Sequence, residues 1–215
     1  FARYGDIPSL QEGISQANRI QPNRALYNEA QQKINQWSSQ IQQQQDQPLL
    51  DQAQALANGG NYRAAIQTAR QVSSGRALYS QAQSKIQTWQ REMVGQQRLQ
   101  KAYELAELRT PDALVSAINI ARQVPSGTQV KGESNTNVNR WSYELLTLAQ
   151  DRANRDLREA INLAQKVPQG TEAYRAAQRQ IESWEMILQP PPPVVTPNVP
   201  PPQSPTVTEI EVPEF

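Results

Sequence analysis

The chain has 215 residues with a formal net charge of +1, and it contains neither histidine nor cysteine. The absence of those two residue types removes the most common general base, the thiol nucleophile, the usual soft metal ligands and all disulfides. Because the charge is nearly balanced and no phosphate-binding or nucleophile motif occurs, we expect no enzyme, no cofactor, no metal ion and no nucleic-acid partner.

Four tryptophans divide most of the chain into similar units. Each follows an isoleucine by 23 positions, and the pairs are Ile14 and Trp37, Ile66 and Trp89, Ile118 and Trp141, and Ile161 and Trp184. Apolar residues three positions before and four after each tryptophan share its helical face. The pattern predicts an all-α fold. We expect a solenoid-like array of four tandem helical repeats in residues 1–188, each with a short helix, a tight turn and a longer helix that carries the tryptophan.

The first unit covers roughly residues 1–47. Ser9 and Glu12 have the spacing of a capping box, which predicts the start of the short helix. When the units are aligned on their isoleucines, Phe1 and Tyr4 fall where the helix of a preceding unit would end. We therefore expect the chain to be a fragment of a longer protein with at least one helix upstream.

The second unit covers roughly residues 48–98, and Asn61 stands at the cap position of its short helix. Pro48 and Gly95 follow the first and second tryptophans in the chain. The sequence leaves open whether the two Trp-bearing helices continue through these residues or break there, since proline removes a helical hydrogen bond.

The third unit covers roughly residues 99–152 and is the least regular. Lys131 and Ser134 stand where the other units carry tyrosine and alanine, and Gly132 lies between them. We therefore expect a loop here and a late start of the Trp-bearing helix, near residues 135–138. A tolerated surface loop is the expected role, and a binding loop is the alternative.

The fourth unit covers roughly residues 153–188. Its tryptophan follows the third by 43 residues, whereas the earlier tryptophans are 52 residues apart. Asp156 and Glu159 have the spacing of a capping box, as Thr110 and Pro111 have the order of a cap followed by a first-turn proline. These signals predict where the short helices of the last two units begin.

Residues 189–215 differ from the rest because they are rich in proline. We expect a disordered tail that favours extended polyproline II and acts as a semi-stiff linker. A proline pair such as Pro197 and Pro200 can alternatively dock in an aromatic groove. The alternation of apolar and polar residues over 207–212 predicts a short strand.

Aromatic residues at fixed helical offsets are typical of a core, so we expect the four tryptophans to lie between helices rather than to stack on a ligand. Replacing a fully buried tryptophan by alanine should cost about 3–5 kcal/mol. We expect Trp89→Ala, in the middle of the array, to destabilise the protein more than Trp184→Ala at its end.

Two family resemblances concern the repeat. The stretch 60–72, with Gly60, Tyr62 and small residues, resembles the second helix of tetratricopeptide repeats, although the spacings of 52 and 43 depart from their 34-residue unit. The recurring pattern A-I-x-x-A-x-x-V-P-x-G, followed by Y-x-x-A-x-x-x-I-x-x-W, resembles Gln-rich helical-repeat proteins of cyanobacteria. That resemblance implies a bacterial scaffold without known catalytic residues. Some of those proteins are labelled chromosome-segregation-ATPase-like, but no ATP-binding motif occurs here.

We therefore expect a non-catalytic scaffold for protein–protein interaction, part of a larger protein that is cytoplasmic or membrane-associated. No run of 18 apolar residues exists, so we expect no membrane insertion within this chain, although an anchor can lie upstream. The alternative is a structural spacer or stalk of the cell envelope that positions another domain. A scaffold predicts a groove lined by exposed apolar or aromatic residues, whereas a stalk predicts a surface that is polar all round.

Overall fold

The computed structural model describes residues 5–189, and over this range the protein has eight helices and no strand, which confirms the all-α class. Short and long helices alternate: α1 (Ile7–Ala17), α2 (Tyr27–Asn58), α3 (Tyr62–Ala69), α4 (Tyr79–Ala106), α5 (Pro111–Arg122), α6 (Lys131–Ala153), α7 (Leu157–Ala164) and α8 (Glu172–Leu188). The predictions for Phe1, Tyr4, the proline-rich tail from residue 190 and the strand at 207–212 lie outside the described residues.

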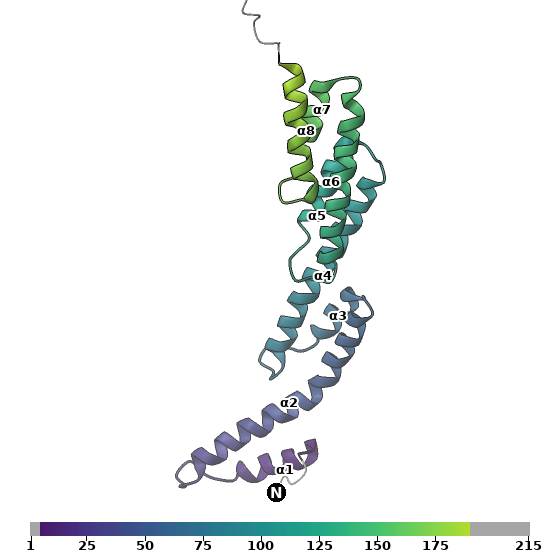
Figure 1. Ribbon diagram of the computed structural model, residues 1–215. Helices are drawn as coiled ribbons and strands as arrows, with labels where there is room; N and C mark the ends of the chain where they lie inside the picture. Colours follow the sequence, from purple (N-terminus) through teal and green to yellow (C-terminus); the bar gives the residue numbers. More distant parts are fainter. Residues whose placement is uncertain (1–4, 190–215) are drawn as a thin grey trace, which may run out of the picture.

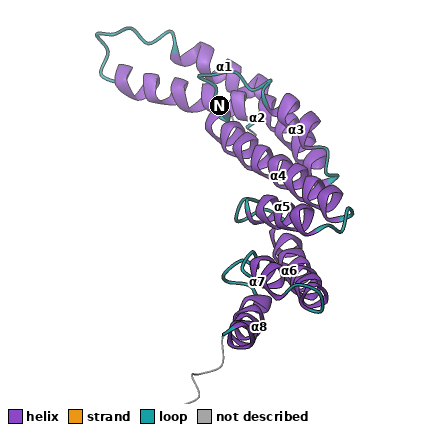
Figure 2. Ribbon diagram, turned by 90° about the horizontal axis from the view of Figure 1, so that it is seen from above, coloured by secondary structure: helices purple, strands orange, loops and turns teal. Residues whose placement is uncertain are grey.

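The helices follow one another along an elongated, curved body with α1 at one end and α8 at the other (Figure 1). Each helix packs mainly on its neighbours in the chain, and each of α3, α5 and α7 contacts the long helix before it and the long helix after it. Figure 2 shows the same succession from above. In such an arrangement the first and last helices have neighbours on one side only.

Polar side chains begin the short helices by accepting backbone N–H groups that have no partner inside the helix. Asn61, Thr110 and Asp156 do so for α3, α5 and α7, as the sequence predicts. The prediction for α1 was wrong, because its cap is Asp6, which accepts the N–H of Ser9 at 3.0 Å. Starting at Ile7 places a proline in the first turn, where a missing N–H costs nothing.

The long helices are continuous. α2 runs through Pro48, and α4 runs through Gly95, which settles the question that the sequence leaves open. Gly95 lies against the turn before α6, where an added Cβ would lie 3.2 Å from Val130. The boundaries between the first three predicted units, at 47/48 and 98/99, therefore lie inside helices, and one long helix serves two neighbouring helix pairs.

The third long helix begins earlier than predicted. α6 starts at Lys131, and the expected loop up to residue 134 was wrong. The turn before it has the same form as the turn before α8: Gly127 has φ +80°, and the Thr128 hydroxyl donates to the carbonyl of Pro125 at 2.8 Å, as Gly170 has φ +81° and Thr171 donates to Pro168. Ser134 is fully buried in place of alanine, and its hydroxyl donates to the carbonyl of Ala121 at 2.6 Å. That hydrogen bond makes the polar side chain acceptable in the core.

Two apolar clusters form the core. One spans α2 to α4 and includes Trp89, and the other spans α4 to α8 and includes Trp141 and Trp184. These three tryptophans are 1–6% exposed, which confirms the prediction that they lie between helices. Trp37 is only half-buried and belongs to neither cluster. The first helix pair therefore differs from the others in how its apolar face is covered.

Candidate functional site

An apolar groove lies between α1 and the first half of α2, and it encloses about 330 Å³. Ala17 and Ile20 line it from the α1 side, and Leu26, Ala30 and Trp37 line it from the α2 side. The indole of Trp37 lies close to the backbone of α1, because Gly13 has no side chain there and an added Cβ would be 3.1 Å from the ring. Three polar side chains complete the lining: Gln16, Glu29 and Lys33.

The tetrapeptide R-A-L-Y begins the long helix of both the first and the second pair, at residues 24–27 and 76–79. In the second pair Leu78 is 9% exposed and belongs to the core. In the first pair the equivalent Leu26 is 60% exposed. The same four residues therefore stand in two different environments.

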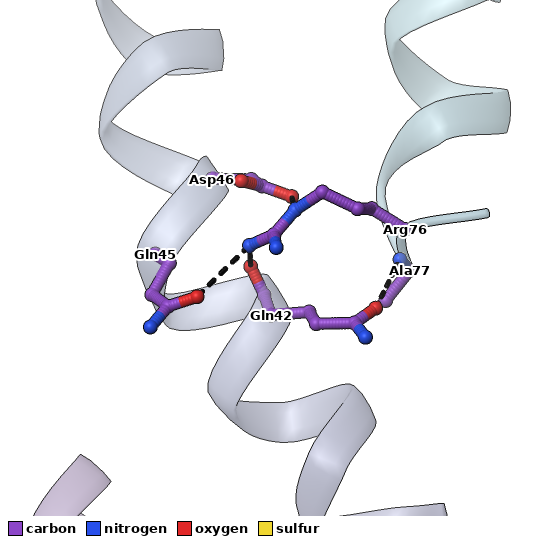
Figure 3. Close-up of polar contacts among 5 residues, drawn as sticks. All are labelled: Gln42, Gln45, Asp46, Arg76 and Ala77. Atoms are coloured by element: carbon purple, nitrogen blue, oxygen red, sulfur yellow. Dashed lines mark hydrogen bonds and ion pairs between the residues drawn. The ribbon is translucent and has the colours of Figure 1, made fainter. Parts of the chain in front are cut away.

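The second copy of R-A-L-Y is held by α2, as Figure 3 shows. The Nε of Arg76 lies 2.5 Å from an Asp46 carboxylate oxygen, and a terminal nitrogen of its guanidinium donates to Gln45 at 3.0 Å. The backbone N–H of Ala77 donates to the side-chain carbonyl of Gln42 at 2.9 Å. These contacts join two turn residues, Arg76 and Ala77, to one face of the preceding helix.

Asp46 is only 5% exposed, so its negative charge depends on a partner. Arg76 supplies that partner, and the hydrogen bond to Asp46 raises the pKa of the guanidinium above its usual range. A charge-assisted hydrogen bond to a buried carboxylate is stronger than one between neutral groups. The Arg76–Asp46 pair is thus a specific clamp between α2 and the turn before α4.

The same backbone position donates to the preceding long helix at every junction between pairs. This position lies twelve residues before the tryptophan. The N–H of Ala77 donates to the side chain of Gln42 at 2.9 Å, and the N–H of Gln129 donates to the Glu92 carboxylate at 3.0 Å. The N–H of Glu172 donates to the side chain of Asn139 at 3.4 Å. In the first pair the equivalent residue is Ala25, which is exposed in the α1–α2 turn and is not preceded by a described long helix.

The opposite end of the molecule also exposes apolar residues. Met186 and Ile187 on α8 are 66% and 65% exposed, and Leu188 is 42% exposed. Leu188 follows its tryptophan by four residues, as Leu145 does on α6, where it is fully buried. Leu26 at one end of the body and Leu188 at the other are therefore exposed at positions whose equivalents Leu78 and Leu145 are buried.

Other hollows on residues 5–189 have more polar linings. The one beside Trp89 is lined by residues such as Lys85, Glu92 and Gln129. No cluster of three or more potential metal-ligating side chains occurs within residues 5–189. None of the helices in that range is long and apolar enough to cross a membrane.

The sequence predicted no catalytic, cofactor or metal residue, and of the groove residues it singled out Trp37, as a core tryptophan. Leu26 and Arg24 lie outside the apolar pattern around the tryptophans, so that pattern does not indicate them. The signal that indicates them is the repetition of R-A-L-Y at residues 24–27 and 76–79. No family model matches the sequence, and neither does any curated protein or solved structure.

Proposed function

We propose that the chain is a solenoid-like array of four helical units that acts as a non-catalytic scaffold for protein–protein interaction. The α1–α2 groove is its binding site. The observation that carries this proposal is the exposure of Leu26 and the half-burial of Trp37 at positions whose equivalents, Leu78 and Trp89, are buried. Exposed apolar residues gathered in a groove are typical of interaction sites.

A helix is the occupant that fits this groove best. In the neighbouring pair, the second half of α2 packs against α3, and its apolar side chains join the same core cluster as residues of α3 and α4. In the first pair only two of the three helices are present among the described residues. Helix-in-groove binding uses apolar side chains that recur every three or four residues, which suits a surface of this kind.

The alternative function is a structural spacer or stalk that positions another domain, as part of a larger protein. The elongated body supports it, because α1 and α8 lie at opposite ends (Figure 1). The exposed apolar residues at both ends favour the scaffold over the spacer, since a spacer needs no uncovered apolar groove. We therefore rank the scaffold first.

Affinity capture from an extract of the source organism tests the scaffold. The bait is the full chain, compared with the Leu26→Asp variant and with Leu108→Asp as the matched control, because Leu108 is 64% exposed but lies between α4 and α5. We expect specific partners to be lost with Leu26→Asp and retained with Leu108→Asp. A chain that ends at Gln189 serves as a second bait. If it captures none of the partners, they bind residues 190–215, and the helical body is a spacer.

A further inference from the structure

We infer that the α1–α2 groove takes an amphipathic, glutamine-containing helix with an acidic residue one turn before a leucine. Its model is the face that residues 42–57 of α2 present to α3 and α4. This inference rests on the proposed function and names the class of partner for the same groove. It commits to an amphipathic helix from outside residues 5–189 that carries Gln, Asp or Glu, Leu and two alanines on one face.

The receiving surface is repeated in the chain. Besides R-A-L-Y, the first and second pairs share an alanine, an isoleucine and a tryptophan at the same offsets, and in the second pair these are Ala82, Ile86 and Trp89. There they are 0–5% exposed. In the first pair Ile34 and Trp37 are half-buried. The two surfaces are matched in chemistry and differ in what covers them.

The covering surface in the second pair is known in detail. Gln42, Asp46, Leu50, Ala53 and Ala57 follow one another at steps of three or four residues, so they share one face of α2. The leucine and both alanines are at most 4% exposed and belong to the same apolar cluster as Trp89. The alanines allow a close approach between helices, and the leucine supplies apolar area.

Charge makes the fit specific. Arg76 is paired with Asp46, whereas the equivalent Arg24 is exposed and has no ion-pair partner within residues 5–189. An acidic residue at the Asp46 position of an incoming helix would meet Arg24, and an amide at the Gln42 position would accept the N–H of Ala25. A basic or purely apolar helix lacks these complementary groups.

A second copy of this chain fits less well. The exposed end of α8 has an acidic residue one turn before an apolar one, Glu182 before Met186. However, α8 ends at Leu188, so it does not extend to the two turns that carry Ala53 and Ala57 in α2. Stacking of copies end to end would also give an open fibre rather than a closed assembly.

A labelled peptide with the sequence of residues 38–58 tests the inference against the full chain by fluorescence anisotropy. We expect binding, together with a blue shift of tryptophan emission that is absent in Trp37→Phe. Arg24→Asp in the protein or Asp46→Arg in the peptide should each weaken binding by roughly tenfold or more, because a charge-assisted hydrogen bond is lost. Combining the two changes should restore most of the affinity. Arg179→Asp, an exposed arginine on α8, is the control for net charge.

Several results would overturn the inference. If Leu26→Asp abolishes peptide binding but the charge exchange has no effect, the groove takes apolar helices without the acidic residue, and the proposed function stands. If the peptide does not bind while captured partners still depend on Leu26, the partner class is wrong and the scaffold remains. If Leu26→Asp leaves the affinity for the peptide unchanged, the peptide binds outside the α1–α2 groove. Concentration-dependent self-association that Leu26→Asp abolishes would make a second copy the occupant.

Discussion

The first and second helix pairs carry the same R-A-L-Y and the same alanine, isoleucine and tryptophan after it, yet only the second pair is closed. Leu78 and Trp89 belong to one apolar cluster with residues from the second half of α2, whereas Leu26 and Trp37 face a groove. The difference shows that burial in this protein is determined by the preceding helix rather than by the sequence of the pair itself. A position that is core in one pair is therefore available for binding in the other.

The tryptophans should separate the two pairs most strongly. Trp89→Ala should lower the free energy of unfolding by about 3–5 kcal/mol, because it leaves a large cavity in a closed core. Trp37→Ala should cost less, about 1–2 kcal/mol, because its ring is only partly removed from water. Urea denaturation measures both. Equal losses would mean that the two pairs are equally closed in solution.

The earlier expectation for Trp184 is sharpened by the structure. Trp89 and Trp184 are 5% and 6% exposed, so burial alone does not separate them. We still expect Trp89→Ala to lower the free energy of unfolding more than Trp184→Ala does. The reason is that Trp89 has packed helices on both sides along the chain, not that it is more deeply buried. Among the tryptophans, we now expect the smallest loss of unfolding free energy for Trp37→Ala in the first pair rather than for Trp184→Ala in the last.

The two leucines of R-A-L-Y give the next largest contrast. Leu78→Ala should destabilise the protein by about 2–3 kcal/mol, since a buried leucine loses apolar contacts. Leu26→Ala should stay within about 0.5 kcal/mol, as is usual at exposed positions. Thermal and urea unfolding of the two variants measure the difference. A large cost for Leu26→Ala would show that the groove is covered in the isolated chain.

The two arginines sharpen the comparison further. Arg76→Ala should lower the Tm, because it leaves the carboxylate of Asp46 nearly buried without its cation. Arg24→Ala should leave the Tm unchanged, since Arg24 is exposed and has no ion-pair partner within residues 5–189. Calorimetry of both variants checks this. Similar Tm values for the two would indicate that the Arg76–Asp46 clamp contributes little.

The smallest expected effect concerns alkaline pH and a pair far from the groove. Tyr103 donates to the Glu133 carboxylate at 2.6 Å, and this hydrogen bond raises the pKa of Tyr103 above its usual value. The stabilisation is therefore complete below about pH 10 and is lost as the pH rises through the raised pKa. Tyr103→Phe should flatten that part of the stability profile. Tyr143→Phe, at an exposed tyrosine of α6, should leave it unchanged.

Features that depend on local chemistry were predictable from the sequence. Thr110 and Asp156 begin their helices because a side-chain oxygen lies within reach of N–H groups two or three residues later. The tryptophan spacing likewise predicted the long helices. Passage through Pro48 was not predictable, because packing of the residues on either side, Asp46 and Leu50, holds α2 together there.

The start of α6 and the groove were missed for a different reason. The composition around Gly132 indicates a loop, but the turn that precedes it and the buried hydrogen bond of Ser134 determine where the helix begins. Trp37 has the same spacing as the other tryptophans, so periodicity cannot show that no helix within residues 5–189 covers it. Only the placement of α2 relative to α1, α3 and α4 shows that difference.

One long helix shared by two pairs has a consequence for how such a chain can be lengthened or rearranged. The residues that close each junction stand on the preceding long helix, and at the first junction they are Gln42, Asp46 and Leu50, from the middle of α2 onward. A segment that begins at one short helix and ends before the next would therefore lack the residues that close its own junction. A segment that can be exchanged as a unit instead begins midway along one long helix and ends midway along the next. Recombination within the long helices should therefore preserve the fold better than recombination within the turns.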